Sequence, residues 1–82
     1  MESREEVLAA LISRIASVFG KPESEINEDV RFKEDLAAKS TQITQITVHM
    51  EELIDAEVPY MQFIRKATVG EAADYLFSLC EG

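Results

Sequence analysis

Residues Ser40–Ile54 read STQITQITVHMEELI, and the spacing of their apolar side chains predicts an amphipathic helix. On a wheel of about 100° per residue, the side chains expected to face a core fall within roughly 120° of arc. This apolar stripe consists of Ile43, Ile46, Thr47, Met50, Leu53 and Ile54. Ser40 falls at the edge of the stripe, so the wheel places its hydroxyl at the boundary between core and solvent.

Capping signals predict further helices on either side of this one. Ser3 with Glu6, and Thr68 with Glu71, match the capping-box pattern at a helix start. The first helix is expected to end at Gly20. Pro59 is acceptable at the start of a short helical turn in YMQFIRK. Apolar residues then recur at helical spacing in the first helix (Leu8, Leu11, Ile12, Ile15, Phe19) and the last (Ala72, Tyr75, Leu76, Leu79).

A long charged segment separates the first helix from Ser40. Its apolar residues are spaced too irregularly for a helix or a paired strand, and we expect them to pin the loop onto the bundle. They are Ile26, Val30, Phe32 and Leu36. The fold class predicted is therefore all-α: one domain over residues 1–82, with three main helices, one short helix and a long loop after the first helix.

Composition restricts the partners and the compartment. The chain has 82 residues and a net charge of −8, so nucleic acid and anionic membranes would repel it, and membrane insertion is not expected. The lone Cys80 excludes an internal disulfide framework and suits a reducing compartment, which makes the cytoplasm the expected location. The first twenty residues match neither a signal peptide nor a membrane-spanning helix.

Catalytic and metal-binding patterns are missing. The only histidine, His49, lies nine residues from Ser40, which is about 13 Å along one helix, so the two cannot form a nucleophile–base pair. No spacing of ligands favours a metal site. Divalent cations are expected only to screen the acidic cluster of Glu51, Glu52, Asp55 and Glu57, which carries half of the net charge.

The segment Phe32–Gln42, FKEDLAAKSTQ, resembles the attachment motif F-x-x-D-L-G-x-D-S-L-D of the acyl carrier proteins. It matches at Phe32, Asp35, Leu36 and Ser40 without a gap. Later segments also fall where that family has similar ones. They are Met50-Glu51-Glu52, Val58-Pro59, Thr68-Val69 and Asp74-Tyr75-Leu76.

The resemblance implies that Ser40 receives a 4'-phosphopantetheine arm from coenzyme A, delivered by a separate phosphopantetheinyl transferase. The thiol of the arm would hold acyl groups as thioesters for enzymes of lipid or related biosynthesis. Such a chain is a monomeric carrier and not an enzyme. Its partners would be acyl-loading, elongating and acyltransferase enzymes with basic docking patches.

We predict two groups of site residues: one for the acyl chain that the resemblance implies, and one for partner docking, because acids near a helix C-terminus oppose the dipole. A sheltered acyl chain would contact Ile43, Ile46, Met50, Ile54, Phe63 and Ile64. Partner enzymes would dock on Val48, Glu51, Glu52, Asp55 and Glu57. The apolar cluster of Tyr60, Met61, Phe63 and Ile64 has three interpretations: a wall of the acyl pocket, a docking surface, or a short helix that packs down.

Four positions around Ser40 depart from the family motif. Lys39, Thr41 and Gln42 replace Asp, Leu and Asp, and Ala37 replaces a glycine. Either the loop takes another path at Ala37, or it stores about 1 kcal/mol of strain at positive φ. We expect Lys39 to pair with the phosphate of the arm; the alternative is a solvated lysine.

Other interpretations stay open. Ser40 by itself is explained as an N-cap that stabilises the helix by about 1 kcal/mol. A peptidyl or aminoacyl carrier would have the same fold and serine. A degenerate carrier that is never modified would act as a protein–protein adaptor.

Overall fold

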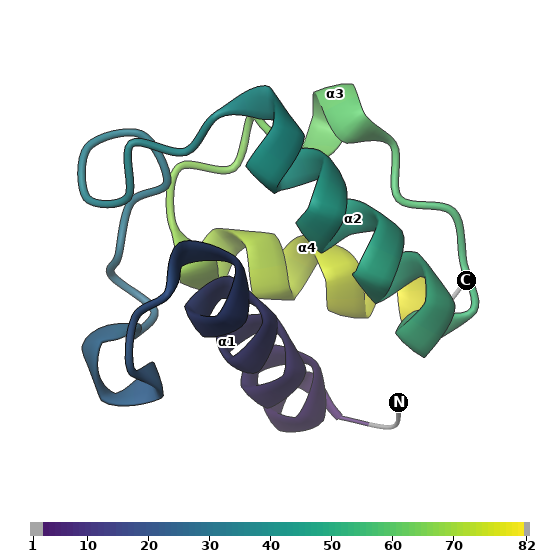
Figure 1. Cartoon of the computed structure of the whole chain (residues 1–82). Helices are drawn as coiled ribbons and strands as arrows, with labels where there is room; N and C mark the ends of the chain where they lie inside the picture. Colours follow the sequence, from purple (N-terminus) through teal and green to yellow (C-terminus); the bar gives the residue numbers. More distant parts are fainter. Residues whose placement is uncertain (1–2, 82) are drawn as a thin grey trace.

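The computed structural model describes residues 3–81, which form an all-helical bundle. The helices are α1 (Arg4–Phe19), α2 (Ser40–Ile54), the four-residue α3 (Tyr60–Phe63) and α4 (Val69–Glu81). A short 3-10 helix, η1 (Glu23–Glu25), lies in the long loop. Helix α1 contacts α2 and α4, and α3 lies beside α2 (Figure 1). Three main helices and one short helix, without a named strand in the described chain, confirm the predicted fold class. No helix within these residues is long and apolar enough to cross a bilayer.

Helix α1 begins and ends at the residues that the sequence predicts. The Ser3 hydroxyl accepts a hydrogen bond from the Glu6 amide at 3.2 Å, which satisfies one of the unpaired donors of the first turn. At the other end, Gly20 has a φ of 65° and its amide donates to the Ala16 carbonyl. The left-handed conformation of Gly20 ends the helix, and glycine is suited to this position because a side chain there would be strained.

The core is built from one side of each main helix. Its largest fully buried side chains belong to α1, α2, α3 and α4: Val7, Leu11, Ile15, Ile46, Met50, Phe63, Val69 and Leu76. Of the predicted stripe on α2, only Leu53 is wrongly assigned, since it is 40% exposed. The wheel places Leu53 at the outer edge of the stripe, where the neighbouring helices of the described chain do not cover it.

The long loop is fixed to the bundle by its apolar side chains, as predicted. Ile26, Phe32 and Leu36 are buried, and Val30 is half-buried. Phe32 lies against Phe63 of α3, with ring centroids 5.7 Å apart and planes tilted by 57°. A tilted aromatic pair of this kind contributes about 0.5–1.5 kcal/mol beyond the area that it buries.

Backbone hydrogen bonds also join this loop to the segment before α4, and the sequence pattern does not reveal them. The amide of Phe32 donates to the Ala67 carbonyl at 3.3 Å, and the amide of Val69 donates to the Val30 carbonyl at 2.9 Å. Between them lies an isolated antiparallel bridge of Arg31 with Thr68. The apolar alternation of a strand is absent, because the paired stretch is too short to present two faces.

Gly70 permits the closest approach of these two segments. Its amide donates to the Glu28 carbonyl at 3.0 Å. A Cβ at this position would lie only 3.0–3.2 Å from three atoms of Glu28. The absence of a side chain at Gly70 therefore allows the loop to sit against the start of α4.

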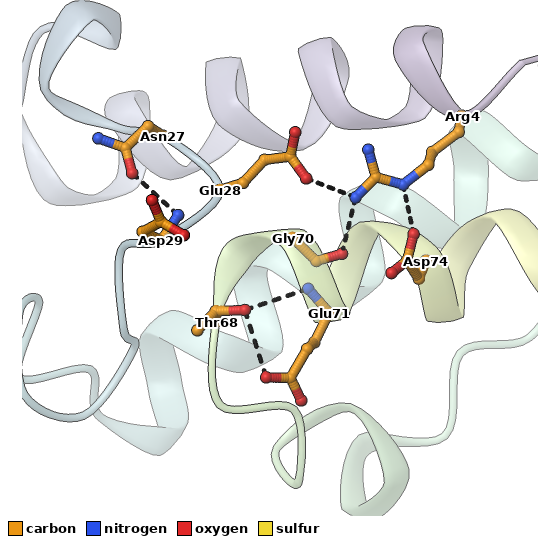
Figure 2. A network of polar contacts seen from close by, with 8 residues as sticks. All are labelled: Arg4, Asn27, Glu28, Asp29, Thr68, Gly70, Glu71 and Asp74. Carbon is orange, nitrogen blue, oxygen red and sulfur yellow. Dashed lines mark hydrogen bonds and ion pairs between the residues drawn. The ribbon is translucent and has the colours of Figure 1, made fainter.

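Arg4 joins α1 to the same region. Its guanidinium donates to the Glu28 carboxylate at 2.6 Å and to the Gly70 carbonyl at 3.3 Å (Figure 2). It also donates to the Asp74 carboxylate on α4. The hydrogen bonds that Arg4 donates to the carboxylates of Glu28 and Asp74 raise the pKa of its guanidinium. This network connects three segments that are distant in the sequence.

Candidate functional site

A closed turn positions the start of α2. The Arg31 carbonyl accepts from the amides of Asp35 and Leu36, at 3.0 and 3.2 Å. In return, the Asp35 carboxylate accepts from the Arg31 amide at 2.8 Å. The Glu34 carboxylate pairs with the Arg31 guanidinium and raises the pKa of that group. The Leu36 side chain is buried in the core, so both hydrogen bonds and apolar packing hold the turn in place.

Ala37 completes the turn in a strained conformation. Its φ is 49°, in the left-handed region where an L side chain costs about 1–2 kcal/mol. Of the two alternatives predicted for Ala37, another path of the loop or strain stored at positive φ, the second is therefore correct. The backbone adopts the positive φ that a glycine would favour, and the strain is stored in the folded protein.

Lys39, and not Ser40, is the N-cap residue of α2. The Gln42 side-chain carbonyl accepts from the Lys39 amide at 2.9 Å, and Lys39 makes no side-chain capping bond, because an ammonium has no acceptor. Ser40 is the first helical residue and is exposed. Its hydroxyl has no hydrogen-bond partner within residues 3–81, so the interpretation of Ser40 as a helix cap is wrong.

A pocket of about 200 Å³ opens next to Ser40, between the start of α2 and α3. Its buried side consists of Phe32, Ile43 and Phe63, which are at most 6% exposed. The full lining is Phe32, Lys33, Ala38, Lys39, Ser40, Ile43, Tyr60, Phe63, Ile64 and Lys66. An exposed hydroxyl thus shares one cavity with an apolar wall.

The six residues predicted to contact an acyl chain separate into two groups. Ile43, Phe63 and Ile64 line the pocket beside Ser40. The other three, Ile46, Met50 and Ile54, are also buried in the core but lie outside this lining.

The apolar cluster of Tyr60, Met61, Phe63 and Ile64, on and after α3, is also divided between the pocket and solvent. Tyr60, Phe63 and Ile64 line the pocket, and Phe63 is fully buried. Met61 is 59% exposed and does not line it. The cluster therefore combines packing with a pocket wall, and Met61 is directed to solvent.

Three lysines line the same pocket. Lys33, Lys39 and Lys66 come from the turn, the N-cap of α2 and the connection before α4, and no acidic residue of the described chain joins them in the lining. The Lys66 ammonium lies 5.0 Å from the centroid of the Tyr75 ring, a cation–π contact. The sequence pattern indicates only Lys39, because Lys33 and Lys66 reach the pocket through tertiary structure.

The acids predicted to dock partners lie at the other end of α2 and beyond it. Glu52, Asp55 and Glu57 are exposed. Glu51 is half-buried, and its carboxylate accepts from the Val58 amide at 2.8 Å, which fixes the connection to α3. Glu51 thus has a structural role that the sequence pattern does not indicate.

A shallow groove of about 320 Å³ follows the outer side of α2 next to α1. Val48, predicted to face outward, is 50% exposed there. Arg14 contributes a buried Nε without a hydrogen-bond partner among the described residues. The groove lining is Arg14, Thr44, Gln45, Val48, His49 and Glu52. Within the described chain, no group of three His, Cys, Asp or Glu side chains is arranged to hold a metal ion.

Comparison with known proteins gives consistent matches over most of the chain. Residues 9–76 match the family model described as "Phosphopantetheine attachment site". The acyl carrier protein of Rubrobacter xylanophilus is 34% identical over 73 residues, which cover 89% of this chain and 90% of the relative. That of Acidothermus cellulolyticus is 32% identical over 74 residues, covering 90% of this chain and 88% of the relative. That of Exiguobacterium sibiricum is 30% identical over 74 residues, covering 90% and 94%.

Proposed function

Because the chain belongs to the acyl carrier protein family, whose prosthetic group is 4'-phosphopantetheine, we propose that Ser40 is the residue that carries this group. The observation that supports this most strongly is the state of the Ser40 hydroxyl. It is exposed, lies on the first turn of a long helix, and has no partner within residues 3–81. A rigid, accessible oxygen is what a transferase needs to form a phosphodiester.

The surroundings of Ser40 fit the prosthetic group. The amides of Ser40 and Thr41 in the first turn of α2 have no acceptor within the helix, and the positive end of the helix dipole favours a phosphate. Lys39, an exposed neighbour, supplies a cation for the same phosphate. When bound, the group provides a terminal thiol that forms thioesters with acyl groups.

The pocket beside Ser40 would shelter part of the acyl chain. Ile43, Phe63 and Ile64 supply its apolar wall, together with the ring of Phe32. The volume of about 200 Å³ lies below the 300–1,000 Å³ that is usual for sites that enclose a drug-sized ligand. We therefore expect a short acyl chain, or the end of a longer one, to be enclosed.

The exposed acids on and after α2 would dock partner enzymes. Glu52, Asp55 and Glu57 face solvent, as does Val48 on the same helix. Negative charges near a helix C-terminus oppose the dipole, so these acids gain nothing locally and are better explained by basic patches on partners. The proposed role is that of a carrier that moves acyl groups between enzymes of lipid or related biosynthesis.

Intact mass spectrometry after incubation with coenzyme A, magnesium and a broad-specificity phosphopantetheinyl transferase tests the assignment. We expect the wild-type chain to gain the mass of one phosphopantetheine, and Ser40→Ala to gain none. Thr41→Ala removes the adjacent exposed hydroxyl and is the matched control, which should still be modified. A wild-type chain that stays unmodified in this assay and in its native cell would instead support a protein–protein adaptor.

The contact between Lys39 and the phosphate is tested with the same material. Modification should raise the melting temperature of the wild-type chain more than that of Lys39→Glu, because the glutamate repels the phosphate. Lys21→Glu makes the same change of charge outside the pocket lining and should behave like the wild type. Equal shifts in all three proteins would show that Lys39 is only a solvated lysine.

A further inference from the structure

The three lysines that line the pocket form a lysine collar, which we define as Lys33, Lys39 and Lys66. They line the same pocket as Ser40, so a group attached to Ser40 lies close to them. Lys33 and Lys39 are exposed, and Lys66 is half-buried with its ammonium held over Tyr75. A chain with 16 acidic and 8 basic residues thus gathers positive charge at its candidate site.

The charge of the collar is not neutralised internally. No carboxylate of residues 3–80 lies at ion-pair distance from any of the three ammonium groups. The acids that follow Lys33 in the sequence already bind Arg31: Glu34 pairs with its guanidinium, and Asp35 accepts from its amide. The positive charge is therefore available to another molecule.

The opposite end of α2 carries the opposite charge. This helix has 15 residues, so its length is about 22 Å. Glu52, Asp55 and Glu57 lie exposed at and beyond its C-terminal end. The screening length at physiological ionic strength is about 8 Å, so the two ends present separate fields of opposite sign.

We propose that the lysine collar docks on an acidic surface around the active-site entrance of the enzymes that act at Ser40, while Glu52, Asp55 and Glu57 meet a basic patch on the same enzyme. This inference rests on the proposed function of Ser40. Two patches of opposite sign fix the orientation of the carrier and disfavour a partner whose docking surface is entirely basic.

The phosphate of the arm does not account for the collar by itself. A phosphodiester carries a single negative charge, and Lys39 is its sequence neighbour. The Lys66 ammonium is directed to the ring of Tyr75. Lys33 and Lys66 therefore leave positive charge in the pocket lining beside Ser40 after the phosphate is paired, and an enzyme that acts at Ser40 must approach this charge.

The rate of modification by the phosphopantetheinyl transferase of the native cell tests the proposal. We expect Lys33→Glu and Lys66→Glu each to lower kcat/KM about tenfold at low salt, and the loss to shrink as salt rises. Glu52→Lys should lower it as well. Lys21→Glu, the matched control outside the collar, should stay within about twofold of the wild type. Calorimetric dissociation constants for the apo chain and transferase provide a readout that is independent of turnover, and circular dichroism checks the fold of each variant.

The sign of the effect decides the outcome. A rise in kcat/KM for Lys33→Glu would mean that the whole surface meets basic partners, and it would overturn the collar proposal, as would an unchanged value. Binding of the wild type to phosphatidylglycerol vesicles that is lost in Lys33→Glu would assign the collar to a membrane surface instead. If the wild type is not modified at all, the proposed function of Ser40 fails first.

Discussion

At the scale of single residues, Ala37 offers the clearest test of stored strain. Its φ of 49° is unfavourable for alanine and acceptable for glycine. Ala37→Gly should raise the free energy of unfolding by about 0.5–1 kcal/mol, because relief of the strain exceeds the added entropy of the unfolded chain. Urea denaturation followed by circular dichroism measures the difference.

Ala38→Gly is the control for Ala37→Gly. Ala38 has no positive φ, so the same substitution there should lower the free energy of unfolding by about 0.4–1 kcal/mol. If both variants lose stability, Ala37 is not strained in solution.

At the scale of elements, Glu51 connects α2 to the segment that leads into α3. Its carboxylate accepts from the amide of the buried Val58 at 2.8 Å. Glu51→Ala should lower the free energy of unfolding by about 1–2 kcal/mol, since it leaves this amide without a partner. Chemical denaturation measures the loss.

The neighbouring Glu52 provides a matched control, because it is exposed on the same helix and gains the same helix propensity on replacement. Glu52→Ala should change stability by less than about 0.5 kcal/mol. Equal losses in the two variants would contradict a structural role specific to Glu51.

At the scale of the whole molecule, the net charge of −8 destabilises the compact state by self-repulsion. Raising NaCl from about 0.05 to about 0.5 M should therefore stabilise the apo chain by about 1 kcal/mol, which is roughly 4–8 °C in melting temperature. Magnesium and calcium should act alike at equal concentration, because the described residues provide no cluster of metal ligands.

A variant with Glu52→Gln, Asp55→Asn and Glu57→Gln tests where this repulsion arises. It should melt at a higher temperature than the wild type and respond less to either cation. A saturable response to calcium alone, at micromolar concentration, would instead demonstrate a specific metal site.

The sequence predicts most of the helical framework, because local signals determine it. The ends of α1 follow from Ser3 and Gly20, and the start of α4 follows from Thr68 with Glu71, whose amide donates to the Thr68 hydroxyl at 3.2 Å. The wrong assignment of Leu53 shows the limit of such signals. A wheel gives the direction of a side chain, but not whether a neighbouring element covers it.

The candidate site is only partly predictable from the sequence, because local signals do not show which distant segments come together. The motif around Ser40 identifies the serine and Lys39 without any structure. Lys33 and Lys66 reach the pocket because the loop pairs with the segment before α4, through bonds such as that from the Val69 amide to the Val30 carbonyl. Backbone bonds between two irregular segments leave no periodic pattern in the sequence.

The sequence by itself determined the helices, the acidic character and the serine at the start of α2, since each depends on residues close together in the chain or on composition. The structure, and not the sequence pattern, showed that Gln42 caps α2 through the nearby Lys39 amide and leaves Ser40 exposed, and that Ala37 keeps a strained backbone. It alone gathered three lysines around one pocket. The gathering of the lysines depends on how the long loop folds back, and that path is fixed by contacts between residues far apart in the chain, such as the bond from the Val69 amide to the Val30 carbonyl.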